Sequence, residues 1–135
     1  MKNISLIISI TLLLPFAYCK KDDNQINYRH EMRSFVKAIS TYARSNSPGF
    51  IIIPQNGIEL ITDNGMSSSL LETSYLNAID GVGQEDLFFG YNHDDVATPA
   101  HETQYLIEFL DRCEQSNVEV LVTDYCSSQS NIGLS

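Results

Sequence analysis

Apolar residues recur at helical spacing at the start of the region that we expect to fold. Arg29–Asn46 carries an apolar residue every three or four positions, which predicts an amphipathic helix that ends at Ser47-Pro48-Gly49. The run Phe50–Ile53 that follows is unbroken, rich in Ile and stopped by Pro54, as is typical of a strand buried on both faces. The helical stripe consists of Met32, Phe35, Val36, Ile39 and Tyr42.

The pattern continues with two further helix-then-strand units. A weaker helical face over Leu70–Ile79 precedes a second predicted strand, Gly81–Leu87. Thr98 then resembles an N-cap with Pro99 at the first helical position, and this helix ends near Ser116. Its apolar stripe consists of Tyr105, Leu106, Phe109, Leu110 and Cys113. The third predicted strand covers Val118–Thr123, and the tail Ser127–Ser135 shows no structural signal.

Three strands, each preceded by a helix, predict an α/β fold built of parallel β/α units. Such units occur in open doubly wound sheets and in β/α barrels, and a complete eight-stranded barrel needs about 250 residues. The 108 residues from Tyr28 to Ser135 can hold less than half of such a barrel. No G-x-G-x-x-G fingerprint joins a strand to a helix, which argues against a dinucleotide site.

An apolar run near the N-terminus, Ile4–Phe16, follows Lys2 and is too short to span a membrane. We therefore expect residues 1–19 to be a signal peptide, residues 20–27 a polar tether, residues 28–126 the folded domain and residues 127–135 an unstructured tail. Phe16-Ala17-Tyr18-Cys19 resembles a bacterial lipobox, which predicts lipidation of Cys19. Ordinary secretion is the alternative, and both predict an exported protein, either anchored in the cell envelope through that lipid or secreted.

The charge balance restricts the partners. The chain has 8 Lys and Arg against 17 Asp and Glu, a formal net charge of −9, and Arg112 is the only basic residue after Arg44. Nucleic-acid binding is disfavoured, because it requires clustered cations that displace counterions from phosphates. The acidic part of the chain suits neutral or cationic partners.

The cysteines are not expected to pair. Cys113 lies near the end of a predicted helix and Cys126 beyond the strand that follows, so the strand separates them by about 25 Å, several times the span of a disulfide. Cys113 is better explained as a small core residue.

Polar side chains follow every predicted strand. In parallel β/α folds the strand-to-helix loops meet at one edge of the sheet, so these groups should share a pocket. A pair of acids, one protonated and one ionised, is what glycosidic hydrolysis requires. Capping of helices and plain solvation are the structural alternatives. The candidate acids are Glu59, Glu85, Asp86 and Asp124, and Gln55, Asn56 and Tyr125 are candidates for binding sugar hydroxyls.

A metal site is not expected. His93-Asp94-Asp95 and His101 have no recognised ligand spacing, and they are better explained as solvated loop residues.

Four motifs in order resemble one known family. They are Phe35–Arg44, Phe50–Leu60 with its Asn-Gly-x-Glu, Tyr75–Gly90 and Val120–Tyr125. Over about residues 28–126 the chain resembles the endo-α-1,4-polygalactosaminidase-like family, glycoside hydrolase family 114. The resemblance implies part of a (β/α)8 TIM-like barrel, incomplete in this chain, that hydrolyses a galactosamine-containing polysaccharide without metal or organic cofactor.

The resemblance also assigns residues. Glu59 matches the expected catalytic glutamate, with the role of general acid, and Glu85 matches a second acid at the same edge whose role the resemblance does not fix. With Asp124, which comes from the strand-end argument, they form the expected catalytic set. Asp86 joins the residues expected to bind substrate. The family's upstream strand with its aspartate is replaced here by the signal segment, so a second chain that completes the barrel, or a surface-tethered carbohydrate-binding protein without catalysis, are the alternatives.

Overall fold

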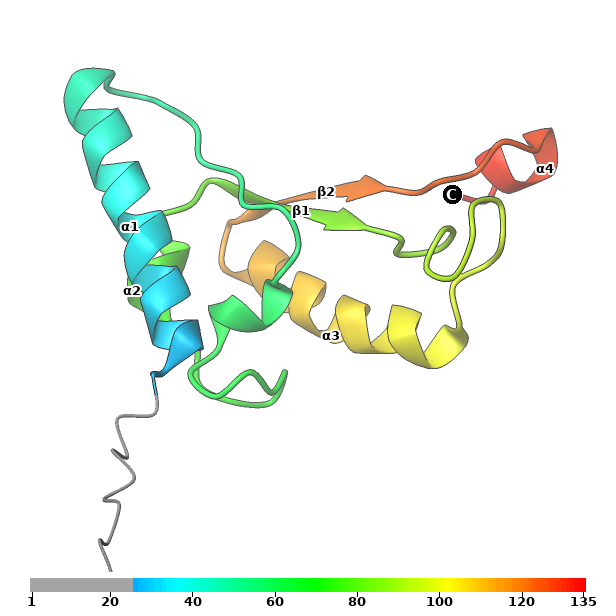
Figure 1. Ribbon diagram of the computed structural model, residues 1–135, viewed down its shortest axis with the longest axis horizontal. Coiled ribbons are helices and arrows are strands. Elements are labelled where there is room, and N and C mark those ends of the chain that lie inside the picture. The colour runs from blue at the N-terminus through cyan, green and yellow to red at the C-terminus, as the bar shows by residue number, and fades with distance from the viewer. Residues whose placement is uncertain (1–25) are drawn as a thin grey trace, which may run out of the picture.

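The structure is a computed structural model, and it describes residues 26–135. The predicted signal peptide, Cys19 and nearly all of the tether lie outside these residues. In chain order, the elements shown in Figure 1 are α1 (Tyr28–Asn46), the 3-10 helix η1 (Ile58–Ile61), α2 (Thr73–Leu76), β1 (Gly81–Glu85), α3 (Ala100–Gln115), β2 (Glu119–Thr123) and α4 (Gln129–Ile132).

The central unit is β1–α3–β2. The two strands are parallel, with Gly81 opposite Glu119 and Glu85 opposite Thr123, and α3 lies below them in Figure 1. Because strand side chains alternate between faces, Val82 and its partner Val120 point to one face of the sheet and Leu121 to the other. Val82 is buried in the core, whereas Leu121 is exposed.

One continuous core lies between the sheet, α3, η1 and α2. Phe109 and Cys113 of α3 and Ile61 of η1 are fully buried in it, which confirms Cys113 as a core residue. Both Cys113 and Cys126 are free thiols. The remaining members of this cluster are Ile52, Ile58, Tyr75, Leu76, Ile79, Val82, Leu87, Leu110 and Val118.

The prediction of a partial TIM-like barrel is wrong. Residues 26–135 form four α-helices and a two-stranded parallel sheet. The predicted parallel pairing of Gly81–Leu87 with Val118–Thr123 is present, but a barrel requires every strand to be paired on both sides. Within the described part of the chain, β2 pairs with β1 alone.

The first predicted strand, Phe50–Ile53, is not a regular strand. Its chain runs beside β1, and Gly83 donates its N–H to Pro54 O at 2.9 Å. However, the Ile52 N–H bonds to the Asp80 carboxylate at 2.7 Å, and Pro54 has no N–H to give. Two ladder positions are thereby lost, and Ile51 and Ile53 are exposed rather than buried on both faces.

The helix predicted over Leu70–Ile79 is reduced to the single turn α2. Its first residues pair instead with the end of η1: Asp63 N–H donates to Leu70 O, and Glu72 N–H donates to Ile61 O. This antiparallel contact holds the backbone extended until Thr73.

The helix boundaries near residues 98 and 129 also differ from prediction. Pro99, not Thr98, is the N-cap of α3, because the Thr98 hydroxyl donates to Asp86 O at 2.7 Å. The tail, expected to be unstructured, contains α4, whose N-cap Ser128 accepts a hydrogen bond from Asn131 N–H.

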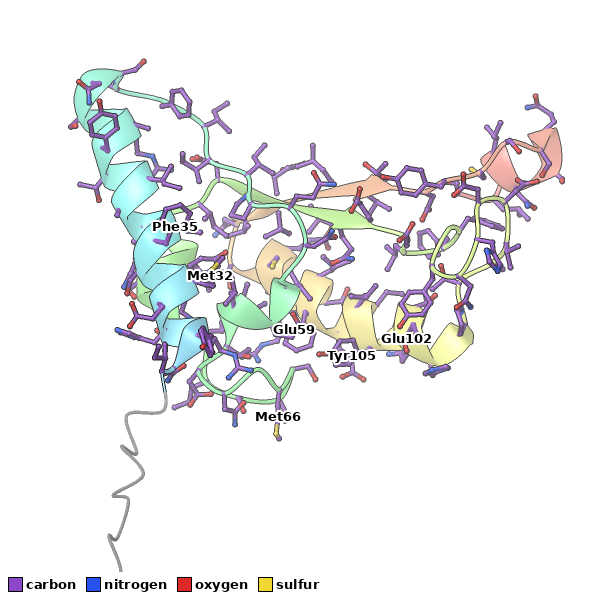
Figure 2. All side chains as sticks on the ribbon, in the orientation of Figure 1. Met32, Phe35, Glu59, Met66, Glu102 and Tyr105 are labelled. Atoms are coloured by element: carbon purple, nitrogen blue, oxygen red, sulfur yellow. The ribbon has the colours of Figure 1, made fainter. Side chains whose placement is uncertain are left out.

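Most of the apolar stripe of α1 does not face the core, although its member Val36 packs against the core, partly buried. Arg33 and Ser40 are the buried residues of this helix, whereas Met32 and Phe35 are 49% and 60% exposed. Figure 2 labels both side chains on α1. The physical reason is Arg33, which lies on a neighbouring face of the helix and donates to Leu60 O at 2.8 Å and to Thr62 O.

Candidate active site

An acidic cavity of about 310 Å³ lies at the carboxyl end of β1. Four carboxyl side chains line it and no Lys or Arg does. Figure 2 shows three of the lining residues, with Glu59 on η1 and Glu102 and Tyr105 on α3. The acidic cavity is lined by Asn56, Glu59, Gln84, Glu85, Asp86, Tyr91, Glu102, Tyr105 and Leu106.

Separate parts of the chain supply these groups. The end of β1 contributes Glu85 and, just after it, Asp86, and η1 contributes Glu59. Glu102 and Tyr105 are three residues apart on α3 and therefore lie on the same side of the helix. The cavity thus depends on the packing of η1 against α3, which are in contact.

Left-handed backbone conformations shape two of its walls. Asn56 and Asp86 both have φ of 59°, a region that few residues other than Gly enter and that Asn and Asp tolerate best. At Asp86 this conformation follows the last residue of β1 and changes the direction of the chain. Gly90 lies so close to the carboxyl that an added Cβ would be 2.3 Å from Asp86 Oδ1.

Glu85 is held as an ionised carboxylate. The Tyr125 hydroxyl donates to Glu85 Oε1 at 2.5 Å, and Asn56 Nδ2 donates to Glu85 Oε2 at 2.7 Å. These bonds lower the pKa of Glu85 below its usual value. The same bond to Glu85, with the charge of that carboxylate, raises the pKa of Tyr125.

The pKa of Asp86 is shifted in the direction opposite to that of Glu85. Its Oδ1 atom is buried and has no hydrogen-bond partner among the described residues. Burial, and next the negative charges of Glu85, Asp124 and Asp94, raise the pKa of Asp86 above its usual value. The neutral form of Asp86 therefore persists to a higher pH than that of an ordinary aspartate, because an uncompensated buried charge is costly.

Two tyrosines contact the remaining carboxylates. The Tyr105 hydroxyl donates to Glu59 Oε1 at 3.0 Å. Burial, and then this bond and the charge of Glu59, raise the pKa of Tyr105 to about 12. A hydrogen bond to Glu102 similarly raises the pKa of Tyr91. Both tyrosines therefore remain neutral hydroxyl donors across the ordinary pH range.

The structure brings together most of the residues that the sequence singled out. Glu59, Glu85, Asp86 and Asn56 all line the acidic cavity, and Tyr125 joins them through its bond to Glu85.

Two of the candidates from the sequence, Asp124 and Gln55, do not line the acidic cavity. Asp124 Oδ1 accepts the N–H groups of Phe88 and Phe89, and its Oδ2 accepts the Ser135 hydroxyl. Asp124 therefore shapes the loop after β1 and is not among the cavity-lining residues. Gln55 forms an isolated bridge with Gly83 and is exposed beside the cavity.

Sequence reasoning missed Tyr91, Glu102 and Tyr105 as site residues. The i, i+3 spacing of Glu102 and Tyr105 on a predicted helix was an available signal, but Tyr105 was counted in the apolar stripe. Tyr91 lies in a loop and gave no signal.

The sequence disfavours a metal site at His93-Asp94-Asp95 and His101, and in the structure Asp95 has a structural role. Asp95 Oδ1 accepts the N–H groups of Ser127 and Ser128, both at 2.9 Å, and fixes the tail. Within residues 26–135, no group of three or more His, Cys, Asp or Glu side chains is placed to hold a metal ion.

Comparison with known proteins assigns no activity. No family model matches the chain. An uncharacterized protein of Deinococcus radiodurans is 36% identical over 69 residues, which are 51% of this chain and 20% of that protein. An uncharacterized protein of Methanocaldococcus jannaschii is 34% identical over 96 residues, 70% of this chain and 25% of that protein. The matches thus span a quarter or less of the length of these curated relatives. Among the helices of the described residues, none is long and apolar enough to cross a membrane.

Proposed function

We propose that this chain is an exported glycoside hydrolase that cleaves a polysaccharide of amino sugars in the acidic cavity. One observation carries the proposal: the neighbours Glu85 and Asp86 both line the cavity, and their pKa values are displaced in opposite directions. Glycosidic hydrolysis uses such a pair, with one carboxyl protonated and the other ionised.

In the proposed reaction Asp86 is the general acid. Its neutral carboxyl donates a proton to the glycosidic oxygen, so that the C–O bond breaks and the leaving sugar departs as an alcohol. Glu85, ionised and oriented by Tyr125 and Asn56, stabilises the positive charge that develops on the other sugar ring. Water supplies the hydroxyl group that completes the new reducing end, and the proton that this water releases restores the neutral carboxyl of Asp86.

The substrate class follows from the charge of the cavity. Glu59 and Glu102 face the same space as the reacting pair, with no Lys or Arg lining it, and carboxylates attract the ammonium groups of a deacetylated amino sugar. The resemblance to the polygalactosaminidase-like family suggests a galactosamine polymer. The resemblance of residues 16–19 to a lipobox supports export, with either a lipid anchor at Cys19 or secretion.

The test is release of reducing ends from polygalactosamine by the full chain. Because general acid catalysis contributes about 10²–10⁴-fold, we expect Asp86→Asn and Glu85→Gln each to lower kcat by that order. The matched control is Asp111→Asn, an exposed carboxylate on α3 outside the cavity. Full activity of Asp86→Asn would exclude the proposed acid.

The pH profile gives an independent measurement. Activity should fall on the acid side as Glu85 takes up a proton, and on the basic side as Asp86 loses one. The lowered pKa of Glu85 moves the acid-side fall to a lower pH than an ordinary glutamate would give, and the raised pKa of Asp86 moves the basic-side fall to a higher pH than an ordinary aspartate would give. An optimum above pH 8 would contradict the assignment.

A carbohydrate-binding protein without turnover is the second candidate. The exposure of Tyr91 and Tyr105, 48% and 40%, favours it, because an open site with exposed aromatic rings binds sugars but excludes little water. Saturable binding of polygalactosamine with no reducing ends released at any pH would establish this alternative in place of hydrolysis.

A further inference from the structure

A second, oppositely charged pocket lies between α1 and α2, away from the acidic cavity. Its volume is about 250 Å³, and the two helices that form it are in contact, side by side in Figure 1. None of its lining residues is acidic. We call it the α1–α2 pocket, and its polar lining residues are Lys37, Ser40, Thr41, Arg44, Ser74 and Asn77.

Lys37 supplies a cation whose charge is not compensated by a carboxylate. Its Nζ donates to the Ser74 hydroxyl at 3.3 Å, and the salt bridges of the described residues do not include it. An ammonium group has three protons, so two more remain for a ligand. In a chain with a net charge of −9, a cationic pocket stands out from the rest of the surface.

Ser40 provides the second, independent observation. It is one of the two buried residues of α1, only 3% exposed, and it lines this pocket. None of the hydrogen bonds found among residues 26–135 involves its hydroxyl. Its Oγ atom is not among the buried side-chain atoms that lack a partner, so the hydroxyl is accessible from the pocket and free to donate to a ligand or water there.

Arg44 supplies further N–H donors to the pocket, while its charge is paired with Asp80. Its Nη2 is bonded to Asp80 Oδ2 at 2.7 Å, but its Nε and Nη1 form only long contacts of 3.4 Å, with Phe50 O and Asn77 O. These N–H groups can exchange a weak carbonyl contact for a stronger bond to an anion.

We propose that the α1–α2 pocket binds a phosphate group. Lys37 and Ser40 of α1, Ser74 of α2 and Asn77 at the C-cap of α2 present donors to this pocket. A tetrahedral oxyanion carries several strong acceptor oxygens to receive them. Free phosphate, a phosphomonoester and the phosphodiester headgroup of a lipid share this chemistry. The proposal does not depend on the function proposed for the acidic cavity.

The test is an NMR titration of the full chain with inorganic phosphate at constant ionic strength. We expect saturable shifts of the amides of residues 37–44 and 73–78. Lys37→Ala should weaken binding at least tenfold, because the charge-assisted hydrogen bond from the ammonium group is lost. Lys37→Arg should retain most of the affinity, and Ser40→Ala should weaken it less than Lys37→Ala.

Arg29→Ala is the matched control, since Arg29 is on the same helix but outside the pocket. Equal weakening by Arg29→Ala and Lys37→Ala would show nonspecific attraction to a basic helix and overturn the proposal, as would the absence of shifts in these segments. Titration with glycerol 3-phosphate and with glycerophosphoglycerol then distinguishes the sources. Tighter binding of the phosphodiester indicates a lipid headgroup, and tighter binding of phosphate or the monoester indicates a soluble ligand.

Discussion

The carboxyl group of Asp86 owes its environment to a single glycine. Gly90 has φ of 122°, a conformation that L side chains rarely adopt, and its Cα faces Asp86 Oδ1. The absence of a Cβ there lets the loop after β1 close over the carboxyl. The neutral acid required by the proposed reaction therefore depends on a residue that itself carries no chemistry.

Gly90→Ala should consequently damage both stability and the site. The new methyl group would lie 2.3 Å from Asp86 Oδ1 and displace it, in addition to the roughly 1–2 kcal/mol that the left-handed backbone costs an L residue. Gly49→Ala is the control, because Gly49 has φ of 88° with nothing within 4 Å of its Cβ position. Urea denaturation should show a larger loss for Gly90→Ala, and equal losses would contradict the steric argument.

Asp95 is a second single residue on which a whole segment depends, because it anchors the C-terminal segment that contains α4. Its Oδ1 accepts bonds from Ser127 N, Ser128 N, the Ser128 hydroxyl and Asn131 Nδ2. The backbone bonds from Ser128 and Ser127 are the main reason that the pKa of Asp95 is lowered to about 2. Because the folded pKa lies below the unfolded value of about 3.9, this stabilisation is complete above that value and is lost as the pH falls towards 2.

Replacing Asp95 should therefore release α4 at neutral pH. We expect Asp95→Ala to accelerate hydrogen exchange at the amides of Asn131 and Ile132, which are bonded within this short helix, while Asp94→Ala leaves exchange there unchanged. Protection of these amides in Asp95→Ala equal to that in the unmodified chain would contradict the anchoring effect.

Which site residues could be predicted from sequence depends on what places them. Glu59, Glu85 and Asp86 follow strand-like runs, so the rule that strand ends share one edge was sufficient to bring them together. Asp124 met the same rule, but its carboxylate is used by the N–H groups of Phe88 and Phe89. That use depends on how a loop folds back, and no local pattern encodes it.

At the scale of elements, α1 is fastened to the site by an arginine rather than by its apolar stripe. Arg33 is 5% exposed and reaches the carbonyl groups of Leu60, Thr62 and Asp63 and the carboxylate of Glu72. Leu60 belongs to η1, the element that carries Glu59. This side chain therefore links the first helix to a wall of the acidic cavity.

Arg33→Met should destabilise the fold by about 2–4 kcal/mol. Methionine keeps much of the side-chain volume but leaves buried carbonyl groups without donors, and losses of this kind are the costly ones. Arg29→Met, one turn earlier and not buried, should cost less than about 1 kcal/mol. Chemical denaturation followed by circular dichroism measures both, and a similar cost for the two variants would show that burial of Arg33 contributes little.

The same arginine explains why element positions were easier to predict than element orientations. The 3.6-residue pattern placed α1 within one residue of its observed start and at its observed end. It did not identify the buried face, because the hydrogen bonds from Arg33 determine which face of α1 packs inward.

For Phe50–Ile53, composition predicted a strand, but one carboxylate at Asp80 and one proline prevented a regular ladder.

At the scale of the whole molecule, the described residues expose an unusual amount of apolar surface on α1. Met32, Phe35, Ile39 and Tyr42 are all at least 42% exposed. A contiguous stripe of this kind promotes association in solution.

Met32→Lys combined with Phe35→Lys should reduce association without unfolding the chain. Exposed positions contribute little to stability, so the free energy of unfolding should change by about 0.5 kcal/mol or less, whereas Phe109→Ala, at a position with 0% exposure, should cost about 3–5 kcal/mol. Light scattering over a concentration series measures association. Unfolding caused by the double lysine variant would show that the stripe packs against the fold.

The hydrogen bond from Tyr125 to Glu85 has a practical consequence for detecting ligands. The chain contains 7 tyrosines and no tryptophan, so its ultraviolet emission comes from tyrosine alone, and a phenol that shares its proton with a carboxylate emits weakly. A sugar that takes over Glu85 would free this phenol and brighten the fluorescence. The increase should be smaller in Tyr125→Phe, because only Tyr91 and Tyr105 would then keep carboxylate bonds that a ligand could break. The difference between the two proteins reports occupancy at Glu85.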